Sequence, residues 1–95
     1  MLIKWADSAH RDITAILRYF IEKQEKDVGQ NLVNRLFSSV ELLAQFPKSG
    51  RPGQVEGTRE LVIPDQSYIL IYKVTDHVEI ARVLHTRQKW PQPPI

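Results

Sequence analysis

Two amphipathic segments joined by a very short link constrain the fold of this chain most strongly. Over residues 8–24 the apolar side chains recur at spacings of three and four: Ala9, Ile13, Ile16, Leu17, Phe20 and Ile21. A second segment repeats this pattern with Leu32, Leu36, Val40 and Leu43. Such spacing places the apolar residues on one face of a helix. The link, residues 24–26, is so short that the two helices must form an antiparallel hairpin.

The ends of both predicted helices carry capping or helix-breaking residues. Asp7 or Ser8 is expected to cap the first helix through a side-chain oxygen. Asp27 followed by Gln30 resembles a capping box at the start of the second helix. Pro47 ends that helix, because proline has no backbone N–H to donate.

Short runs of β-branched and aromatic residues predict four strands separated by turn residues. These strands are residues 2–6, 58–63, 67–74 and 77–84. The last three are joined by short connections, which predicts an antiparallel meander. A loop over 47–57 precedes the meander, and its Pro52-Gly53 pair suits the centre of a type II turn.

The predicted order of elements is therefore β-α-α-β-β-β, in a single domain over residues 1–95. We expect an α+β fold in which a small, mainly antiparallel sheet carries the αα-hairpin on one face. A chain of 95 residues has room for one core. Apolar residues alternate onto both sides of the strand at 67–74, so the pattern leaves open which face of the sheet packs on the helices.

Composition argues against several functional classes. The chain has no cysteine, which excludes disulfides, thiol nucleophiles and thiolate zinc sites and fits a reducing compartment. Its histidines, His10, His77 and His85, are not spaced as metal ligands, so we expect neither a metal nor another cofactor. The longest apolar run, 68–72, is far shorter than the ~20 residues that span a bilayer. We therefore expect a cytoplasmic protein without a membrane partner.

Positive charge gathers near the ends of the predicted strands. The net charge of +2 does not by itself indicate a nucleic-acid partner, but no acidic residue follows Glu79. The cationic and titratable residues near strand ends are Arg51, Arg59, Arg82, His85 and Arg87. Because arginine forms paired hydrogen bonds with oxyanions, this set predicts an anion-facing surface on which His85 transfers a proton.

A structural interpretation of the same residues stands beside the functional one. Arg59 pairs with Glu60 or Glu56 in that interpretation, and Arg82 is a solvated strand residue. In a meander the start of the strand at 58–63 and the exit of the strand at 77–84 lie at opposite ends of the sheet. Arg59 and His85 are therefore not expected to converge.

Aromatic residues also have two interpretations. Trp90 either stacks on a nucleic-acid base or anchors the proline-rich tail, 87–95, which we expect to lack regular structure. Four apolar side chains on the helices either belong to the core or line a groove for an amphipathic partner segment: Tyr19, Phe20, Val33 and Phe37.

Several stretches, taken in order, resemble the RelE/ParE superfamily of type II toxins from bacterial toxin–antitoxin operons. The resemblance covers nearly the whole chain and rests on residues 3–13, 46–53, 57–63, 68–74 and 83–91. It implies the β-α-α-β-β-β fold. It also implies a cognate antitoxin, encoded beside the toxin, whose C-terminal segment wraps the toxin in a hetero-oligomer and neutralises it.

The superfamily has two kinds of target. RelE-like toxins cleave mRNA in the ribosomal A site, and the matching residues here are Arg59 and Arg82 for the phosphate and His85 as the acid. ParE-like toxins bind DNA gyrase and block it without hydrolysis. No tyrosine follows Tyr72, and the lysines of the nuclease loop reduce to Lys48. The resemblance thus favours the ParE-like, plasmid-stabilisation branch, with a ribosome-dependent mRNA endoribonuclease as the alternative.

The resemblance and the charge pattern together suggest two sets of functional residues. Those expected to bind the target are Arg51, Arg59, Arg82, Arg87 and Trp90. Those expected to bind the antitoxin are Tyr19, Phe20, Val33 and Phe37. Whether the chain is an enzyme depends on which branch it belongs to.

Overall fold

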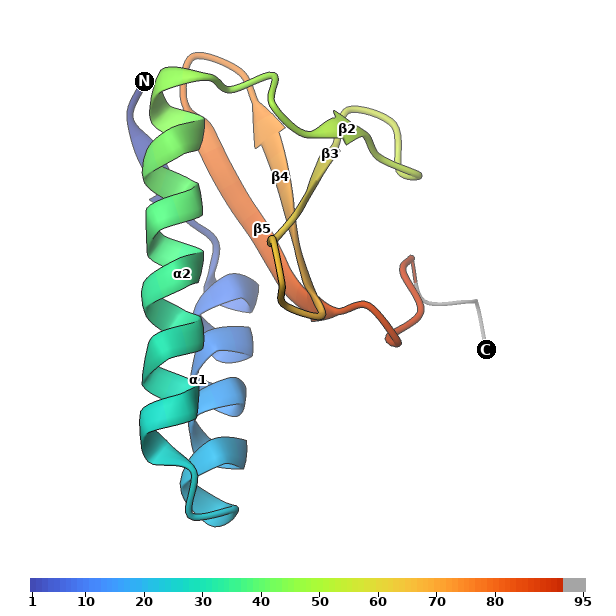
Figure 1. The fold of residues 1–95 in the computed structure, drawn as a ribbon. Helices are drawn as coiled ribbons and strands as arrows, with labels where there is room; N and C mark the ends of the chain where they lie inside the picture. Colours follow the sequence, from blue (N-terminus) through green and yellow to red (C-terminus); the bar gives the residue numbers. More distant parts are fainter. Residues whose placement is uncertain (92–95) are drawn as a thin grey trace.

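The structure, a computed structural model, describes residues 1–91 and places two helices against one face of a five-stranded sheet (Figure 1). The elements in chain order are β1 (Ile3–Trp5), α1 (Asp7–Glu22), α2 (Lys26–Gln45), β2 (Arg51–Pro52), β3 (Arg59–Val62), β4 (Tyr68–Val74) and β5 (Val78–His85). The α+β fold with a helical hairpin on one face is thereby confirmed.

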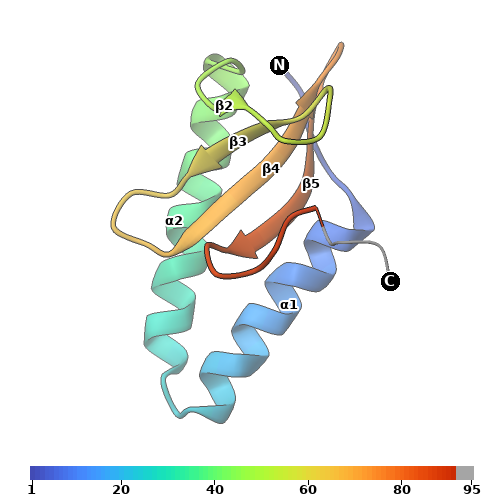
Figure 2. The same cartoon turned by 90° about the vertical axis from the view of Figure 1, so that its right-hand side faces the viewer.

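The sheet has the strand order β1-β5-β4-β3-β2. The pairs β3–β4 and β4–β5 are antiparallel, which confirms the meander, and only β1 runs parallel to its neighbour, β5. The chain between β1 and β5, which contains both helices and the other three strands, provides the long connection that a parallel pair needs. The end of the hairpin where α1 leads into α2 projects beyond the sheet, so this tip stands clear of the strands (Figures 1 and 2).

The loop predicted over 47–57 contains a short strand and turns at a different place. β2 pairs with Arg59–Glu60 of β3 at the edge of the sheet, where proline is tolerated. The type II turn predicted at Pro52-Gly53 is wrong, because such a turn needs a positive φ at Gly53. Within residues 1–91 the only glycine with a positive φ is Gly57, at +83°.

The predicted helix caps are also wrong. α1 follows Ala6, whose side chain has no oxygen to cap with, and Asp7 lies in the first turn. α2 follows Glu25, which makes no side-chain cap hydrogen bond, and Asp27 lies in the first turn. Both aspartates remain at helix N-termini, where their charge interacts favourably with the helix dipole.

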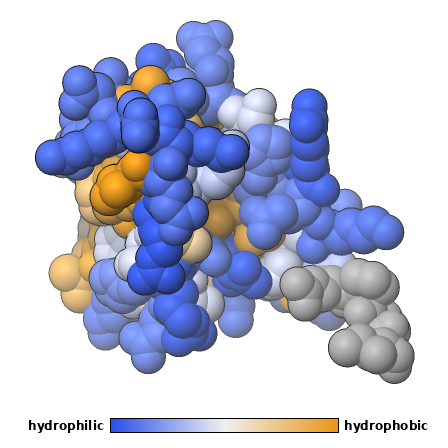
Figure 3. All heavy atoms as spheres, turned by 90° about the horizontal axis from the view of Figure 1, so that it is seen from below, coloured by the Kyte–Doolittle hydropathy of each residue, from blue (hydrophilic) through white to orange (hydrophobic). Residues whose placement is uncertain are grey.

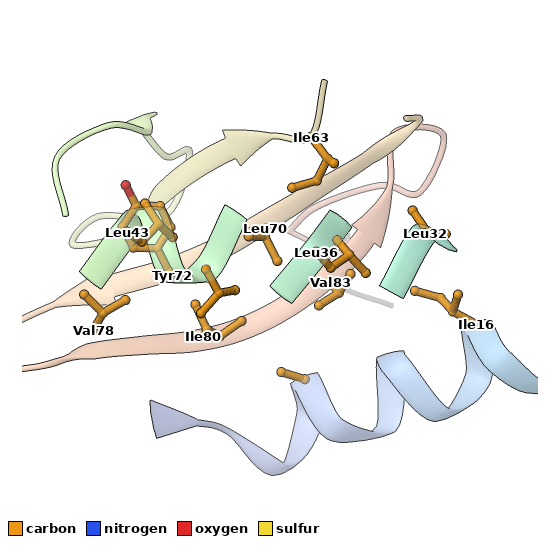
Figure 4. Close-up of a cluster of buried hydrophobic side chains, with 12 residues drawn as sticks. Ile16, Leu32, Leu36, Leu43, Ile63, Leu70, Tyr72, Val78, Ile80 and Val83 are labelled. Atoms are coloured by element: carbon orange, nitrogen blue, oxygen red, sulfur yellow. The ribbon is translucent and has the colours of Figure 1, made fainter. Parts of the chain in front are cut away.

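The core shows which face of the sheet packs on the helices (Figure 4). Leu70 and Tyr72 of β4 are fully buried against Leu36 and Leu43 of α2 in one apolar cluster. Residues 86–91 after β5 form neither helix nor strand, and residues 92–95 of the predicted tail lie outside the described part of the chain. No helix within residues 1–91 has the length and apolar character needed to cross a bilayer.

A β-bulge changes which residues of β5 face the helices. Ile71 pairs with Arg82, but the next residue, Tyr72, pairs with Ile80, so Ala81 is the extra residue. A bulge shifts the alternation of side chains along a strand by one position. The strict alternation of the sequence therefore fails at Ala81: Val83 joins the core cluster on the helical side.

Beyond the end of β1, side chains from the start of α1 form hydrogen bonds with the backbone of β5. Ser8 donates from its hydroxyl to the carbonyl of Ala81 at 2.6 Å. Asp12 accepts from the backbone N–H of Val83 at 2.8 Å. Side chains of the helix thus satisfy strand groups that β1 is too short to reach.

Candidate functional site

The face of the sheet that turns away from the helices holds a cavity of about 200 Å³. This sheet-face cavity lies between the segment around β2 and the segment that follows β5, on the side shown in Figure 2. Its polar lining comes from Arg51, Gln54, Glu60, Thr86, Gln88 and Trp90. Three of the predicted site residues therefore meet here: Arg51, Trp90 and, at one end, His85.

A buried carboxylate organises one wall of the sheet-face cavity. The Glu60 side chain is only 8% exposed and accepts hydrogen bonds from Arg51 Nε at 3.2 Å and Arg51 Nη2 at 3.1 Å. It also accepts from the backbone N–H of Gln54 at 3.3 Å. The Arg51 side chain remains 61% exposed, so its other N–H groups are open to a ligand.

Arg59 lies outside the sheet-face cavity, and its contacts differ from the predicted ion pair. It pairs with neither Glu60 nor Glu56: its Nε donates to the carbonyl of Gly50 at 3.0 Å and its Nη2 to the carbonyl of Lys48 at 3.1 Å. Arg59 stands opposite Tyr72 in the sheet and so faces the helical side. Its guanidinium holds the loop after α2 and does not line the sheet-face cavity.

Tyr72 secures the same loop from inside. Its hydroxyl donates to the carbonyl of Pro47 at 2.8 Å and accepts from the N–H of Gly50 at 2.8 Å. A Cβ atom at Gly50 would lie 2.7 Å from this hydroxyl and from the carbonyl oxygen of Glu60. Only glycine lets the loop approach β3 and β4 this closely.

Arg82 is paired, so the interpretation of it as a solvated residue is wrong. Its Nε and Nη2 donate to the two carboxylate oxygens of Asp12 at 2.8 and 3.1 Å. The hydrogen bond to Asp12 raises the pKa of Arg82 above its ordinary value. The guanidinium carbon lies 5.8 Å from the centre of the Trp90 ring, a cation–π contact that holds the indole.

His85 stands at the end of β5 with one ring nitrogen already engaged. Its Nδ1 accepts from the backbone N–H of Arg87 at 3.0 Å, which assigns the proton of the neutral ring to Nε2. Its ring packs edge-to-face on Tyr68, with the centroids 5.2 Å apart. His85 pairs with Tyr68 and Arg59 pairs with Tyr72, four residues further along β4, so His85 and Arg59 do not converge, as the sequence predicts.

A second hollow, the hairpin groove, lies between the tip of the helical hairpin and the β3–β4 turn. It has a volume of about 510 Å³, and its walls include Tyr19, Phe20, Lys23, Tyr68 and His85. Burial raises the pKa of the Tyr68 hydroxyl, and the neighbouring Tyr19 raises it further. Figure 3 views the molecule from this tip and shows hydrophobic surface among hydrophilic residues. Ile21 and Val28 are exposed there.

The four residues predicted to bind an antitoxin are not brought together. Tyr19 and Phe20 contact each other at the hairpin groove, with ring centroids 5.2 Å apart. Val33 is only 3% exposed and belongs to the interior. Phe37 is 45% exposed and packs edge-to-face on Trp5 in a separate groove of about 490 Å³ between β1 and α2.

Comparison with known proteins identifies the family. Residues 3–90 match the model of the ParE toxin of type II toxin-antitoxin system, parDE. The chain belongs to the ParE toxin family. It is also 43% identical over 90 residues to "Putative toxin Y4kP" of Sinorhizobium fredii (strain NBRC 101917 / NGR234), a match that covers 95% of this chain and 93% of that relative.

Two solved structures share the fold of this ParE-family toxin. One, described as the chromosomal ParDE TA system from P. aeruginosa, has a TM-score of 0.79 at 23% identity and covers 90% of this chain and 95% of its own. The other, a YafQ mutant from E. coli, has a TM-score of 0.56 at 22% identity and covers 87% of this chain and 90% of its own. Because the present chain belongs to the ParE toxin family, it is the toxin component of a type II toxin–antitoxin system, and a cognate antitoxin is its partner.

Sequence reasoning missed the acidic half of the site. The sequence predicts no role for Asp12, and it predicts Glu60 only as an alternative partner of Arg59, whereas Glu60 binds Arg51. No local pattern reveals that Asp12 pairs with Arg82, because the two are 70 positions apart in the chain. Within residues 1–91 no cluster of three or more histidine, aspartate and glutamate side chains is placed to hold a metal ion.

Proposed function

We propose that this toxin binds DNA gyrase and blocks it, and that its cognate antitoxin neutralises it. The observation that carries the proposal is the arrangement of Arg59, Arg82 and His85. Acid–base cleavage of RNA needs such groups to converge on one phosphate. Here Arg59 bonds to loop carbonyls, Arg82 bonds to Asp12, and His85 lies at the other end of the sheet from Arg59. This dispersal supports inhibition by binding rather than by cleavage.

The sheet-face cavity and the segment after β5 are the surface that we assign to the target. Arg51 and Trp90 line the cavity, and Arg87 is exposed on the segment that forms one of its walls. Arg59 and Arg82 support this surface through the contacts that fix the loop and the indole. Arg59 and Arg82 therefore contribute to target binding indirectly, because they hold the residues that contact the target in place.

The antitoxin, we infer, covers the two grooves of the helical layer. An amphipathic helix laid in the hairpin groove would bury Tyr19 and Phe20, and a continuing segment would cover Phe37. Both grooves are lined by half-exposed aromatic side chains, which supply much of the binding energy in protein interfaces. The resulting complex is a hetero-oligomer in the cytoplasm, where gyrase acts.

Induction of the toxin in living cells distinguishes the proposal from its alternative. We expect nucleoid morphology to change before the rate of translation falls, because gyrase is blocked first. Toeprinting of ribosomes should show no new cuts in the A site. A-site cuts that His85→Ala abolishes would instead establish a ribosome-dependent mRNA endoribonuclease. Harmless overexpression would contradict both and favour a domain that only binds a partner.

A further inference from the structure

We propose that the sheet-face cavity binds a carboxylate, the side chain of an aspartate or glutamate on the toxin's protein target. The inference rests on the proposed function only for the source of that side chain. The preference of the cavity for a carboxylate follows from its own donors, volume and charges, and it can be tested on the isolated toxin.

The first observation is an unsatisfied donor. Trp90 lines the cavity, and its Nε1–H is buried without a hydrogen-bond acceptor in the described part of the chain. Among the side chains of residues 1–91 it is the one buried nitrogen or oxygen atom that lacks a hydrogen-bond partner. Because an indole N–H can only donate, the group that satisfies it must be an acceptor. Buried donors are normally paired, so an orphan beside a cavity points to a ligand.

The second observation is that the indole is held in place. Arg82 lies over the Trp90 ring at 5.8 Å, and Asp12 fixes Arg82 with hydrogen bonds of 2.8 and 3.1 Å. The orphan N–H is therefore part of an ordered wall. Preorganised donors of this kind bind an acceptor without the cost of ordering a loop.

The third observation is that the remaining lining is rich in donors. Gln88 uses its Oε1 to accept from the backbone N–H of His85 at 2.7 Å, which leaves its NH₂ group to donate. Arg51 donates two hydrogen bonds to Glu60, and its other N–H groups remain available to a ligand. Glu60 itself already accepts three hydrogen bonds and offers little to a ligand that donates.

Volume and charge select a carboxylate over a nucleotide. The cavity of about 200 Å³ is smaller than the ~300–1,000 Å³ of typical small-molecule sites, so it does not enclose a nucleotide with its sugar and base. Recognition of a phosphate backbone also needs several available cations. Among the described residues Arg51 is the one lysine or arginine that lines the cavity, and the guanidinium groups of Arg59 and Arg82 are engaged elsewhere. The negative charge of Glu60, which also lines the cavity, is paired with Arg51. A single carboxylate therefore matches the remaining N–H groups of Arg51 and the neutral donors.

The two indole N–H signals of ¹⁵N-labelled toxin provide a direct test. The chain has two tryptophans, and Trp90→Phe assigns the signal of each. The probe is N-acetylglutamate N-methylamide at pH 7, and N-acetylglutamine N-methylamide is the matched neutral probe. We expect the acidic probe to shift the Trp90 signal saturably while the Trp5 signal stays in place, and the neutral probe to leave both unchanged. Arg51→Gln should weaken the apparent affinity for the acidic probe about tenfold.

Three outcomes would overturn the assignment. A Trp90 signal that does not move, or that moves equally with the neutral probe, would show that the cavity does not select a carboxylate. Inorganic phosphate acting at lower concentration than the acidic probe would indicate a nucleic acid instead. These results need only the folded wild-type toxin and the assignment from Trp90→Phe, so they hold even if Arg51→Gln does not fold.

A gyrase assay on the same samples separates the two proposals. We expect Trp90→Phe to need about tenfold more toxin than wild type for equal inhibition of gyrase. Equal potency of the two proteins would overturn the assignment of the cavity to the target. Wild-type toxin that binds the acidic probe but never inhibits gyrase would contradict the proposed function alone and leave the carboxylate site standing.

Discussion

Asp12 binds both the side chain of Arg82 and the strand that carries it. One carboxylate oxygen accepts from Arg82 Nε and from the backbone N–H of Val83, each at 2.8 Å, and the other accepts from Arg82 Nη2 at 3.1 Å. The side chains are 15% and 27% exposed, so the pair is largely shielded from water. A single residue of α1 thereby joins the helix to β5 and fixes the guanidinium that lies over Trp90.

Removing this carboxylate should destabilise the fold. Asp12→Ala leaves the Arg82 charge and the Val83 N–H without an acceptor, and we expect a loss of about 2–3 kcal/mol in the free energy of unfolding. Urea denaturation measures it. Asp7→Ala, in the first turn of the same helix, is the control and should cost less than ~1 kcal/mol through the helix dipole. Equal losses for both variants would show that the Asp12 contacts contribute nothing particular.

The hydroxyl of Tyr72 makes a second prediction about stability. Tyr72→Phe keeps the buried ring but leaves the carbonyl of Pro47 and the N–H of Gly50 without their partner. We expect a loss of about 1–3 kcal/mol, measured by thermal or urea unfolding. Tyr19→Phe removes an exposed hydroxyl and should change stability by less than ~0.5 kcal/mol. A Tyr72→Phe protein as stable as wild type would show that the loop does not need this anchor.

Antitoxin binding should depend on the aromatic wall of the hairpin groove. Tyr19→Ala removes a half-exposed ring that packs on Phe20, and we expect the dissociation constant of the toxin–antitoxin complex to rise at least tenfold, about 1.4 kcal/mol. Calorimetric titration of the toxin with its antitoxin measures this change. Ile21→Ala is the matched control, because Ile21 is equally exposed but does not line the groove. If Ile21→Ala weakens binding as much as Tyr19→Ala, the antitoxin lies on the outer tip instead.

Burial of the Tyr68 hydroxyl predicts a specific loss of stability at alkaline pH. The pKa of Tyr68 is raised in the folded protein, so the unfolded chain loses this proton first as pH rises. Its contribution to stability is therefore complete below about pH 10, the ordinary tyrosine pKa, and disappears as pH rises through the folded value. The free energy of unfolding should fall less in Tyr68→Phe than in wild type as the pH rises above about 10. Parallel curves for the two proteins would contradict the shift.

Local periodicity predicted most of the fold because the elements that obey it are long. The helical hairpin and the β3–β4–β5 meander follow from spacings within single segments. The failures have tertiary causes. Ser8 bonds to Ala81 of β5 instead of capping α1, and the bulge at Ala81 breaks the alternation of β5. β2 has only two residues, too few to show a pattern.

The site was less predictable because its chemistry depends on pairing. Arg51, Arg59 and Arg87 do lie at or just beyond strand ends, whereas Arg82 lies within β5. The sequence does not show which of these arginines keep N–H groups for a ligand. Arg51 and Arg59 are near neighbours in sequence and face opposite sides of the sheet, where one binds Glu60 and the other binds backbone carbonyls. Val33 and Phe37 lie one helical turn apart, yet one is interior and the other is exposed.

The supercoiling activity of DNA gyrase tests the central claim most directly. Purified toxin, added in increasing molar ratio to gyrase and relaxed plasmid, should inhibit supercoiling, and addition of the cognate antitoxin should restore it. His85→Ala should inhibit as well as wild type, because the proposed mechanism involves no proton transfer. Full supercoiling in the presence of a molar excess of folded toxin would contradict the account.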